Sequence, residues 1–288
     1  MIEEDLLREL LLIYVIAMGA CIGSFINVVI VRLPEGKSVV RPGSKCPKCD
    51  TSIPWHDNIP ILSFLLLLGK CRVCKVPISP RYPLIEIVMA ALMAAFWVRF
   101  GLSWELLVWL PLSATLVVIA FIDIDHWIIP DVLVFPMMLW VLGGVVLSDS
   151  MTLLSSGLGL IPAGIIFAVG WCFEKFTGRE GLGFGDVKLL ALIGLAVGPV
   201  SALNILLLSS FQGAFIGIIM RLFTSGHEAQ KSSSTKEDSI FDDDWVPPAY
   251  AIPFGPFLVL ATLQCILLPA TFGSIGEKIS YFLLGIMG

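Results

Sequence analysis

Long apolar stretches, separated by short polar ones, dominate the pattern of residues along this chain. A run of about 20 apolar residues is long enough to cross a hydrocarbon layer of about 30 Å as a helix. A glycine-proline pair at 198–199 separates the short sixth run from the seventh. The sequence therefore predicts an all-α polytopic membrane protein with about eight transmembrane helices. The runs lie near residues 7–31, 82–100, 104–122, 131–148, 153–174, 187–199, 200–223 and 252–271.

Composition supports a membrane protein and argues against a soluble enzyme. The 288 residues are 57% hydrophobic and 14% charged, whereas a soluble domain has about 25% charged residues. The first run follows acidic residues and has no basic region before it, so we expect a retained helix and not a signal peptide. Gly19 and Gly23 in this run form a GxxxG pattern, which permits close helix packing within one bundle or between two chains.

Basic residues are concentrated after the first run. Nine of the 18 lysines and arginines lie between Arg32 and Arg81, against three acidic residues. The positive-inside rule then places this segment in the cytoplasm and the amino terminus outside. We expect three parts: a first transmembrane helix at 1–31, a small cytoplasmic domain at 32–81, and a membrane core at 82–288 with a flexible polar cytoplasmic loop at 224–250.

Four of the seven cysteines form two CxxC pairs separated by 21 residues: Cys46, Cys49, Cys71 and Cys74. Thiolates at this spacing can surround one tetrahedral zinc ion, which would stabilise so small a domain. Two disulfides are disfavoured by the cytoplasmic placement. A redox pair normally needs one CxxC in a thioredoxin-like setting, which is not evident. The other three cysteines lie singly in apolar runs, where cysteine usually behaves as a small hydrophobic residue. We find no internal repeat along the chain.

Carboxylates stand at the ends of three apolar runs. Asp123 follows the third run, Asp186 begins the sixth and Glu86 begins the second. A charge at the centre of a bilayer costs about 3 kcal/mol, so such groups are candidates for function. Two carboxylates that meet share a proton, and such a dyad hydrolyses peptide bonds without a metal. The sequence contains neither a Ser/His/Asp set nor an HExxH motif that would offer another hydrolytic chemistry.

Each of these residues also has a structural interpretation. The glycines at 181, 183 and 185 allow an extended substrate to approach Asp186, or they form a turn before a helix whose positive end favours a carboxylate. We expect capping or loop roles for Asp125 and Asp131. For Glu86 a structural hydrogen bond and an auxiliary role in the site remain equal alternatives.

Taken together, these motifs give the chain a specific resemblance. It resembles the type IV prepilin peptidases, the bifunctional leader peptidase and N-methyltransferase enzymes of bacterial pilus and type II secretion systems. The matching segments cover most of the chain except the polar linker. They are GACIGSFINVVIVRLP (19–34), the paired CxxC motifs, SPRYPLIEIV (79–88), FIDIDHWIIPD (121–131), GREGLGFGDVKLLALIG (178–194) and AIPFGPFLVLA (251–261).

The resemblance implies an aspartic peptidase of the bacterial inner membrane with a GxGD motif. It would cut the basic leader of type IV prepilins and pseudopilins after glycine at the cytoplasmic face and methylate the new amino terminus with S-adenosylmethionine. It assigns Asp123 and Asp186 as the catalytic pair, and Cys46, Cys49, Cys71 and Cys74 as zinc ligands. The expected partners are these substrates and the lipid bilayer, with no nucleic acid.

Several points remain open at the level of sequence. There is no Rossmann unit, so the residues of the methyl-donor site are unknown, with Glu86 as one candidate. The segment 253–256 forms either part of a substrate groove or a helix entry turn. The acidic run 242–244 either attracts a basic leader or belongs to a solvated linker. A proton-coupled transporter and a noncatalytic scaffold are the competing functions.

Overall fold

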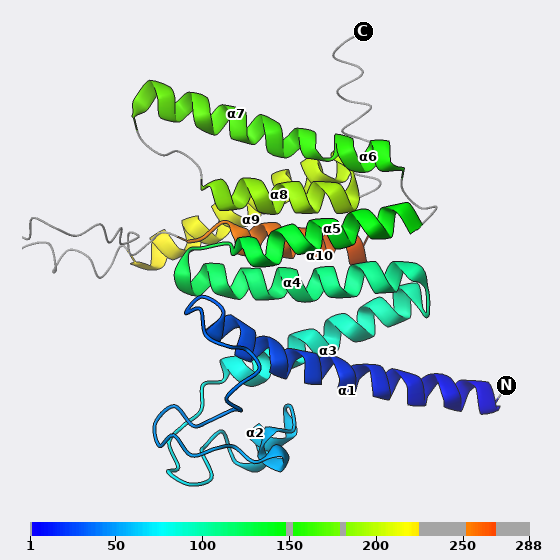
Figure 1. The fold of residues 1–288 in the computed structure, drawn as a ribbon, viewed down its shortest axis with the longest axis vertical. Coiled ribbons are helices and arrows are strands. Elements are labelled where there is room, and N and C mark those ends of the chain that lie inside the picture. Colours follow the sequence, from blue (N-terminus) through cyan, green and yellow to red (C-terminus); the bar gives the residue numbers. More distant parts are fainter. Residues whose placement is uncertain (1, 148–151, 179–182, 225–251, 269–288) are drawn as a thin grey trace, which may run out of the picture.

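The computed structural model describes residues 2–147, 152–178, 183–224 and 252–268, and these residues fold into helices with no β-strand among them (Figure 1). This confirms the predicted all-α class. The polar loop predicted at 224–250 and the acidic run within it lie almost entirely outside the described residues. The helices are α1 (Ile2–Arg32), a 3₁₀ turn η1 (Trp55–Asn58), α2 (Leu62–Leu66), α3 (Arg81–Phe100), α4 (Trp104–His126), α5 (Asp131–Leu147), α6 (Leu153–Leu158), α7 (Leu160–Thr177), α8 (Phe184–Val197), α9 (Pro199–Thr224) and α10 (Gly255–Leu267).

Within the described residues, five segments are long and apolar enough to cross a membrane: Glu9–Arg32, Arg81–Phe100, Trp104–His126, Leu153–Thr177 and Pro199–Leu222. The apolar helices α5 and α10 are shorter. Every predicted apolar run is helical in the described residues, and the fifth is divided into α6 and α7. The boundary predicted at Gly198-Pro199 is also present. Gly198 has a φ of +80°, which ends α8, and Pro199 begins α9 because proline fits the first helical turn.

The centre of the bundle is formed by α4, α5, α8 and α10, which lie side by side in Figure 1 with α1 and α3 on one side and α6 and α7 on the other. Fully buried aliphatic side chains such as Leu116, Ile119, Leu190 and Ile193 make up its core. A second cluster joins α1, α3 and α4. The carboxyl-terminal end of α4 is thereby held by apolar packing from two directions.

The third run extends further than its apolar residues predict. The run was expected at 104–122, but α4 continues to His126 and closes with Trp127 in a left-handed conformation, whose N–H donates to the carbonyl of Asp123. Asp123 is therefore a residue of the last helical turn and not of the following loop. Its side chain is only 5% exposed because it points into the bundle.

Glycines bring two pairs of helices into close contact. A methyl group added at Gly23 of α1 would lie 2.7 Å from the Cα atom of Glu86, and one at Gly19 would lie 2.8 Å from that of Ala90. The GxxxG pattern is therefore used within this chain, between α1 and α3. Gly194 of α8 and Gly159, before α7, touch through their backbones so closely that a methyl group on either would overlap the other's carbonyl oxygen.

The contact at Gly194 sets the position of α8 and provides a test of the packing. Alanine is a better helix former than glycine by about 1 kcal/mol, but here its methyl group must displace the backbone at Gly159. We expect Gly194→Ala to destabilise the protein by about 1–3 kcal/mol, the usual cost of overpacking. The melting temperature of the purified protein in detergent measures this.

Gly164→Ala is the matched control, because a methyl group at Gly164 of α7 has no atom within 4 Å. It should melt at or slightly above the wild-type temperature. Equal melting temperatures for the two variants would show that α8 does not depend on this contact.

Candidate active site and metal centre

The four cysteines of the two CxxC pairs converge. Their Sγ atoms all lie within 4.8 Å of one another, and those of Cys46 and Cys74 are 3.7 Å apart. Four sulfurs bound at about 2.3 Å around a tetrahedral ion would be about 3.8 Å apart. The donor set and its spacing therefore fit one four-coordinate metal ion, with no coordination position left for a substrate.

The two CxxC turns, called knuckles here, are built alike, and the sequence carries the same repeat: residues 45–53 read KCPKCDTSI and residues 70–78 read KCRVCKVPI. The amide of Cys46 donates to Thr51 and that of Asp50 to Cys46. The same bonds recur 25 positions later, from Cys71 to Val76 and from Lys75 to Cys71. The isolated bridges Lys45–Ser52 and Lys70–Pro77, and the positive φ of Asp50 and Lys75, follow the same offset. The domain is an internal repeat of two turns, and our expectation of no repeat was wrong here.

Hydrogen bonds favour the thiolate form that a metal requires. The hydroxyl group of Thr51 lies 3.4 Å from Sγ of Cys49 and, together with the Thr51 amide, lowers the pKa of that thiol to about 6. The amides of Cys74 and Val73 lower the pKa of Cys71. The pKa of Cys74 is instead raised to about 11, because burial and the neighbouring cysteines outweigh the hydrogen bond of the Val76 amide. Two of the four thiols are therefore shifted toward the thiolate form.

A buried carboxylate attaches the metal-binding domain to α3, and a buried amide joins α1 to α3 nearby. Glu86 of α3 accepts a 2.7 Å hydrogen bond from the amide of Ile61, just before α2. Asn27 of α1 donates to the carbonyl of Tyr82 at 3.1 Å. Glu86 therefore has the structural hydrogen bond that was one of its two predicted roles. A bidentate pair between Arg72 and Asp57, at 2.6 and 2.5 Å, connects the second knuckle to η1.

Asp123 and Asp186, the predicted carboxylate pair, lie near enough to each other to interact electrostatically. Asp123 lies in the last turn of α4 and Asp186 in the first turn of α8. Asp186 is half-buried, and its carboxylate acts electrostatically on that of Asp123. The position of Asp186 also suits the positive end of the helix dipole, so the structural interpretation of this residue is compatible with the functional one.

A backbone amide of α10 holds Asp123 in place. The N–H of Gly255 donates to Oδ2 of Asp123 at 3.1 Å, across 132 positions of sequence. Any side chain at position 255 would overlap this carboxylate oxygen. The helix begins at Gly255, with Pro256 where its missing N–H costs no helical hydrogen bond. The entry turn expected at 253–256 is present, and it contributes directly to the candidate site.

Two ion pairs flank the aspartates. Arg81 of α3 pairs with Asp125 at 2.6 Å and also donates to the carbonyl of Phe121. Lys188 of α8 pairs with Asp131, the first residue of α5. Asp125 and Asp131 therefore bind cations of neighbouring helices and do not join the pair of Asp123 and Asp186. The pattern of charges along the sequence did not predict these two ion pairs, because the partners in each pair are at least 44 positions apart.

The glycines before Asp186 differ in what surrounds them. Gly183 precedes the first residue of α8, and Gly185 lies against Ile129, with 3.3 Å between an added methyl group and the Ile129 side chain. Gly185 therefore permits a close approach to another part of the same chain, the segment between α4 and α5. Gly181 lies outside the described residues.

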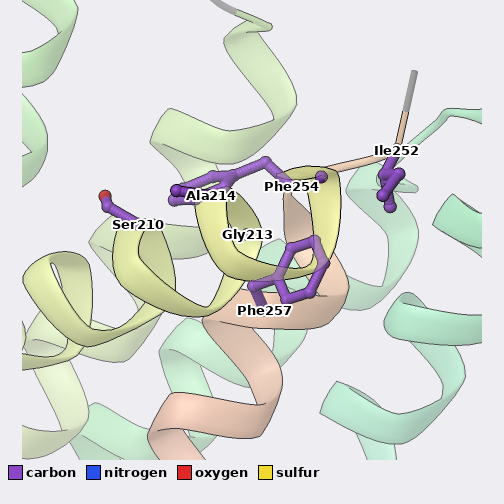
Figure 2. A pocket seen from close by; sticks show the side chains of 7 residues that line it. Ser210, Gly213, Ala214, Ile252, Phe254 and Phe257 are labelled. Atoms are coloured by element: carbon purple, nitrogen blue, oxygen red, sulfur yellow. The ribbon is translucent and has the colours of Figure 1, made fainter. Parts of the chain in front are cut away.

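A cavity of about 360 Å³ lies beside this site, between α9 and α10. Figure 2 shows residues that line it, among them Phe254 and Phe257 and the small residues Ser210, Gly213 and Ala214 of α9. Phe254 directly precedes Gly255, whose amide binds Asp123, so the cavity lies next to the segment that holds Asp123. An apolar cavity beside two carboxylates can hold a peptide whose bond is attacked by an activated water.

Comparison with known proteins gives a consistent result. Residues 17–100 match the Bacterial Peptidase A24 N-terminal domain, and residues 110–218 match the Type IV leader peptidase family. Proteins named "Prepilin leader peptidase/N-methyltransferase" are similar over most of both chains. The one from Myxococcus xanthus (strain DK1622) is 35% identical over 89% of this chain and 90% of its own, and that from Aeromonas hydrophila is 36% identical over 83% and 84%. The Pseudomonas aeruginosa relative is 35% identical over 85% and 86%. Among solved structures there is no match.

The cysteine cluster predicts one tightly bound metal ion per chain. Cys46→Ser and Cys71→Ser each remove one ligand from a different knuckle, so we expect each variant to lose the ion and to expose the domain to proteolysis. Metal analysis of the purified protein measures the stoichiometry. Cys172→Ser, at an exposed cysteine of α7, is the matched control and should retain the ion. A metal-free wild type, or disulfides between the knuckles, would contradict the assignment.

Proposed function

Because the chain belongs to the type IV leader peptidase family, we propose that it is a membrane aspartic endopeptidase and N-methyltransferase. It removes the basic leader of type IV prepilins or pseudopilins and then methylates the new amino terminus. The observation that supports the peptidase activity is the buried Asp123 at the end of α4, which is held by the Gly255 amide and lies within electrostatic reach of Asp186 at the start of α8.

In this proposal, Asp123 and Asp186 share one proton and act together on the scissile peptide bond. One carboxylate removes a proton from a water molecule, whose oxygen forms a bond to the peptide carbon. The other, protonated, donates to the carbonyl oxygen. The carbon–nitrogen bond then breaks, and the leaving amine takes a proton from the pair. The Gly255 amide fixes the orientation of one carboxylate throughout, which keeps the reacting atoms in line.

The substrate lies extended as it passes the pair, because the bonds of a helix are shielded by its own side chains. We assign the cavity between α9 and α10 to the segment that enters the membrane, since it is apolar and borders Gly255. The leader lies at the opposite end of this path, in the cytoplasm, where the basic residues of 32–81 also lie by the positive-inside rule. The enzyme then acts at the cytoplasmic face of the inner membrane.

The cofactors follow from the same assignment. The four-cysteine cluster would bind zinc in a structural role, because four thiolates leave no open position on the ion. The donor of the methyl group would be S-adenosylmethionine. The chain divides functionally into the first helix (1–31), the zinc domain (32–81) and the peptidase core (82–288).

The decisive experiment incubates the purified protein with a prepilin, with and without S-adenosylmethionine, and weighs the product by intact mass spectrometry. We expect loss of the leader in both reactions and an added methyl group only with the donor. An uncut prepilin, in the presence of folded and metal-loaded protein, would refute the proposal for this substrate class.

The carboxylate pair gives a sharper prediction. Asp123→Asn and Asp186→Asn each prevent proton sharing, so we expect either change to reduce the cleavage rate at least about 100-fold, within the range of general acid–base catalysis. Asp125→Asn, two positions from Asp123, is the matched control and should retain measurable cleavage, because its carboxylate pairs with Arg81. Wild-type rates in both dyad variants would exclude the mechanism.

Gly255→Ala tests the support of Asp123. The added methyl group would displace the Asp123 carboxylate and weaken its hydrogen bond. Because small misplacements are costly in catalysis, we expect kcat to fall about 100-fold with a smaller effect on KM. Gly143→Ala in α5 has no atom within 4 Å of the new methyl group and should cleave normally. Equal kcat values for both variants would mean that the Gly255 amide does not position Asp123.

A further inference from the structure

The short helix α2 turns its apolar side chains outward, whereas a surface helix of a water-soluble domain turns them toward the core. Leu62, Leu65 and Leu66 are 57%, 62% and 83% exposed, and they lie on one face because they are three and four positions apart. Leu68, in the turn that follows, is 82% exposed. The buried residue of the helix is Ser63. An exposed apolar surface of this kind marks a place of contact with a lipid or protein surface.

The hydrogen bonds of Ser63 fix this orientation of α2. Its hydroxyl group donates to the carbonyl of His56 in η1 at 3.0 Å and accepts from the amide of Ile59 at 3.0 Å. The ring of Phe64 lies against Gly69, so the turn after the helix is held as well. The helix cannot rotate to bury its leucines without breaking both bonds of Ser63.

The attachment of α2 places it beside the membrane-crossing helices and not beyond their ends. The amide of Ile61, directly before α2, donates to Glu86 at 2.7 Å. Glu86 follows the first residue of α3 by five positions, which is about 7.5 Å along a helix. Its Cα atom touches Gly23 of α1, and both helices are long and apolar enough to cross a membrane. Figure 1 shows α2 to the side of the bundle, level with the first part of α3.

The backbone of this segment suits a position next to hydrocarbon. Backbone polar groups that face lipid must find their partners within the protein. The amide of Ile61 has Glu86, and those of Leu65, Leu67 and Leu68 donate to carbonyls of the same short segment. The leucines can therefore enter the edge of a bilayer while these N–H groups keep their acceptors.

The charges of the metal-binding domain favour a negatively charged partner. Residues 32–81 contain nine lysines and arginines and three acidic residues. Arg41, Lys48, Lys70 and Lys75 are exposed, and no carboxylate of the described residues forms an ion pair with them. Anionic phospholipid headgroups attract such cations. A lipid surface thus fits both features, with acyl chains for the leucines and headgroups for the basic residues.

We propose that the segment 62–68 is a membrane anchor, by which the metal-binding domain inserts into the leaflet on its own side of the bilayer. Its leucines lie at the boundary between headgroups and acyl chains, and the exposed basic residues of the domain lie on anionic headgroups. The domain is thereby fixed at two points, the hydrogen bond to Glu86 and the lipid surface. This inference goes beyond the proposed enzymatic function and does not depend on it.

Photo-crosslinking of the full, metal-loaded protein tests the anchor. p-Benzoylphenylalanine takes the place of Leu66 or Leu68, and the protein is irradiated in nanodiscs of phosphatidylcholine and phosphatidylglycerol. The positive control is the same label at Phe211, which is 76% exposed in the apolar segment Pro199–Leu222. The negative control is Lys37, which is exposed and lies beyond the end of α1. Melting temperature and metal content check that each variant is folded.

We expect lipid adducts at Leu66 and Leu68 with a yield, measured by mass spectrometry, within about 3-fold of that at Phe211 and at least about 10-fold above that at Lys37. Crosslinks to a second copy of the chain would show that the leucines form an interface between copies. A lipid yield as low as that at Lys37 would show that they face water. Either result overturns the anchor and leaves the proposed cleavage and methylation untouched.

The lipid composition tests the role of charge. In nanodiscs of phosphatidylcholine alone, we expect the lipid adducts at Leu66 and Leu68 to fall several-fold, because the anionic headgroups that attract the domain are gone. The yield at Phe211 should stay the same, since this residue lies in a membrane-crossing helix. Equal yields at Leu66 in both lipid mixtures would overturn the preference for an anionic surface.

Discussion

The hydrogen bond from the Gly255 amide to Asp123 is the contact on which the arrangement of the candidate active site depends. It joins the end of α4 to the start of α10 and places a carboxylate in a position that is otherwise almost closed to water. Burying such a group is costly unless a donor compensates it. The compensation here comes from the first turn of a helix, whose N–H groups have no partner within the helix. Both helix ends must therefore form before the site exists.

Further contacts fix the first turn of α8, which carries Asp186, relative to the end of α4 and the start of α10. Gly185 lies against Ile129, and Lys188 pairs with Asp131, so the first turn of α8 is fixed to the connection that follows Asp123. Further along α8, the backbone contact with Gly159 prevents the helix from sliding. The positions of Asp123 and Asp186 are thus determined by contacts on either side of each residue, and not by the two carboxylates themselves.

Much of this could be predicted from the sequence, because some patterns are local. Apolar runs gave the helices, the Gly198-Pro199 pair gave a boundary, and the spacing of Cys46, Cys49, Cys71 and Cys74 gave the cluster. The carboxylates were found because they interrupt apolar runs. The amide of Gly255 could not be found, since a backbone donor has the same chemistry at almost every residue and its partner is 132 positions away. The repeat of the two knuckles is different, because the lysine, the two cysteines and the isoleucine that 45–53 and 70–78 share could have revealed it.

The way in which the two knuckles form makes the start of α3 depend on the metal-binding domain. Each closes with its own short-range hydrogen bonds, so a metal ion joins two turns that are already shaped and closes the loop between them. That loop contains η1 and α2, and its Ile61 amide is a partner of the buried Glu86 in α3. Removal of the ion would release both ends of the loop at once and leave a carboxylate at the membrane edge without its donor. An ion bound by the four cysteines would thereby influence the first turns of α3, where Glu86 lies.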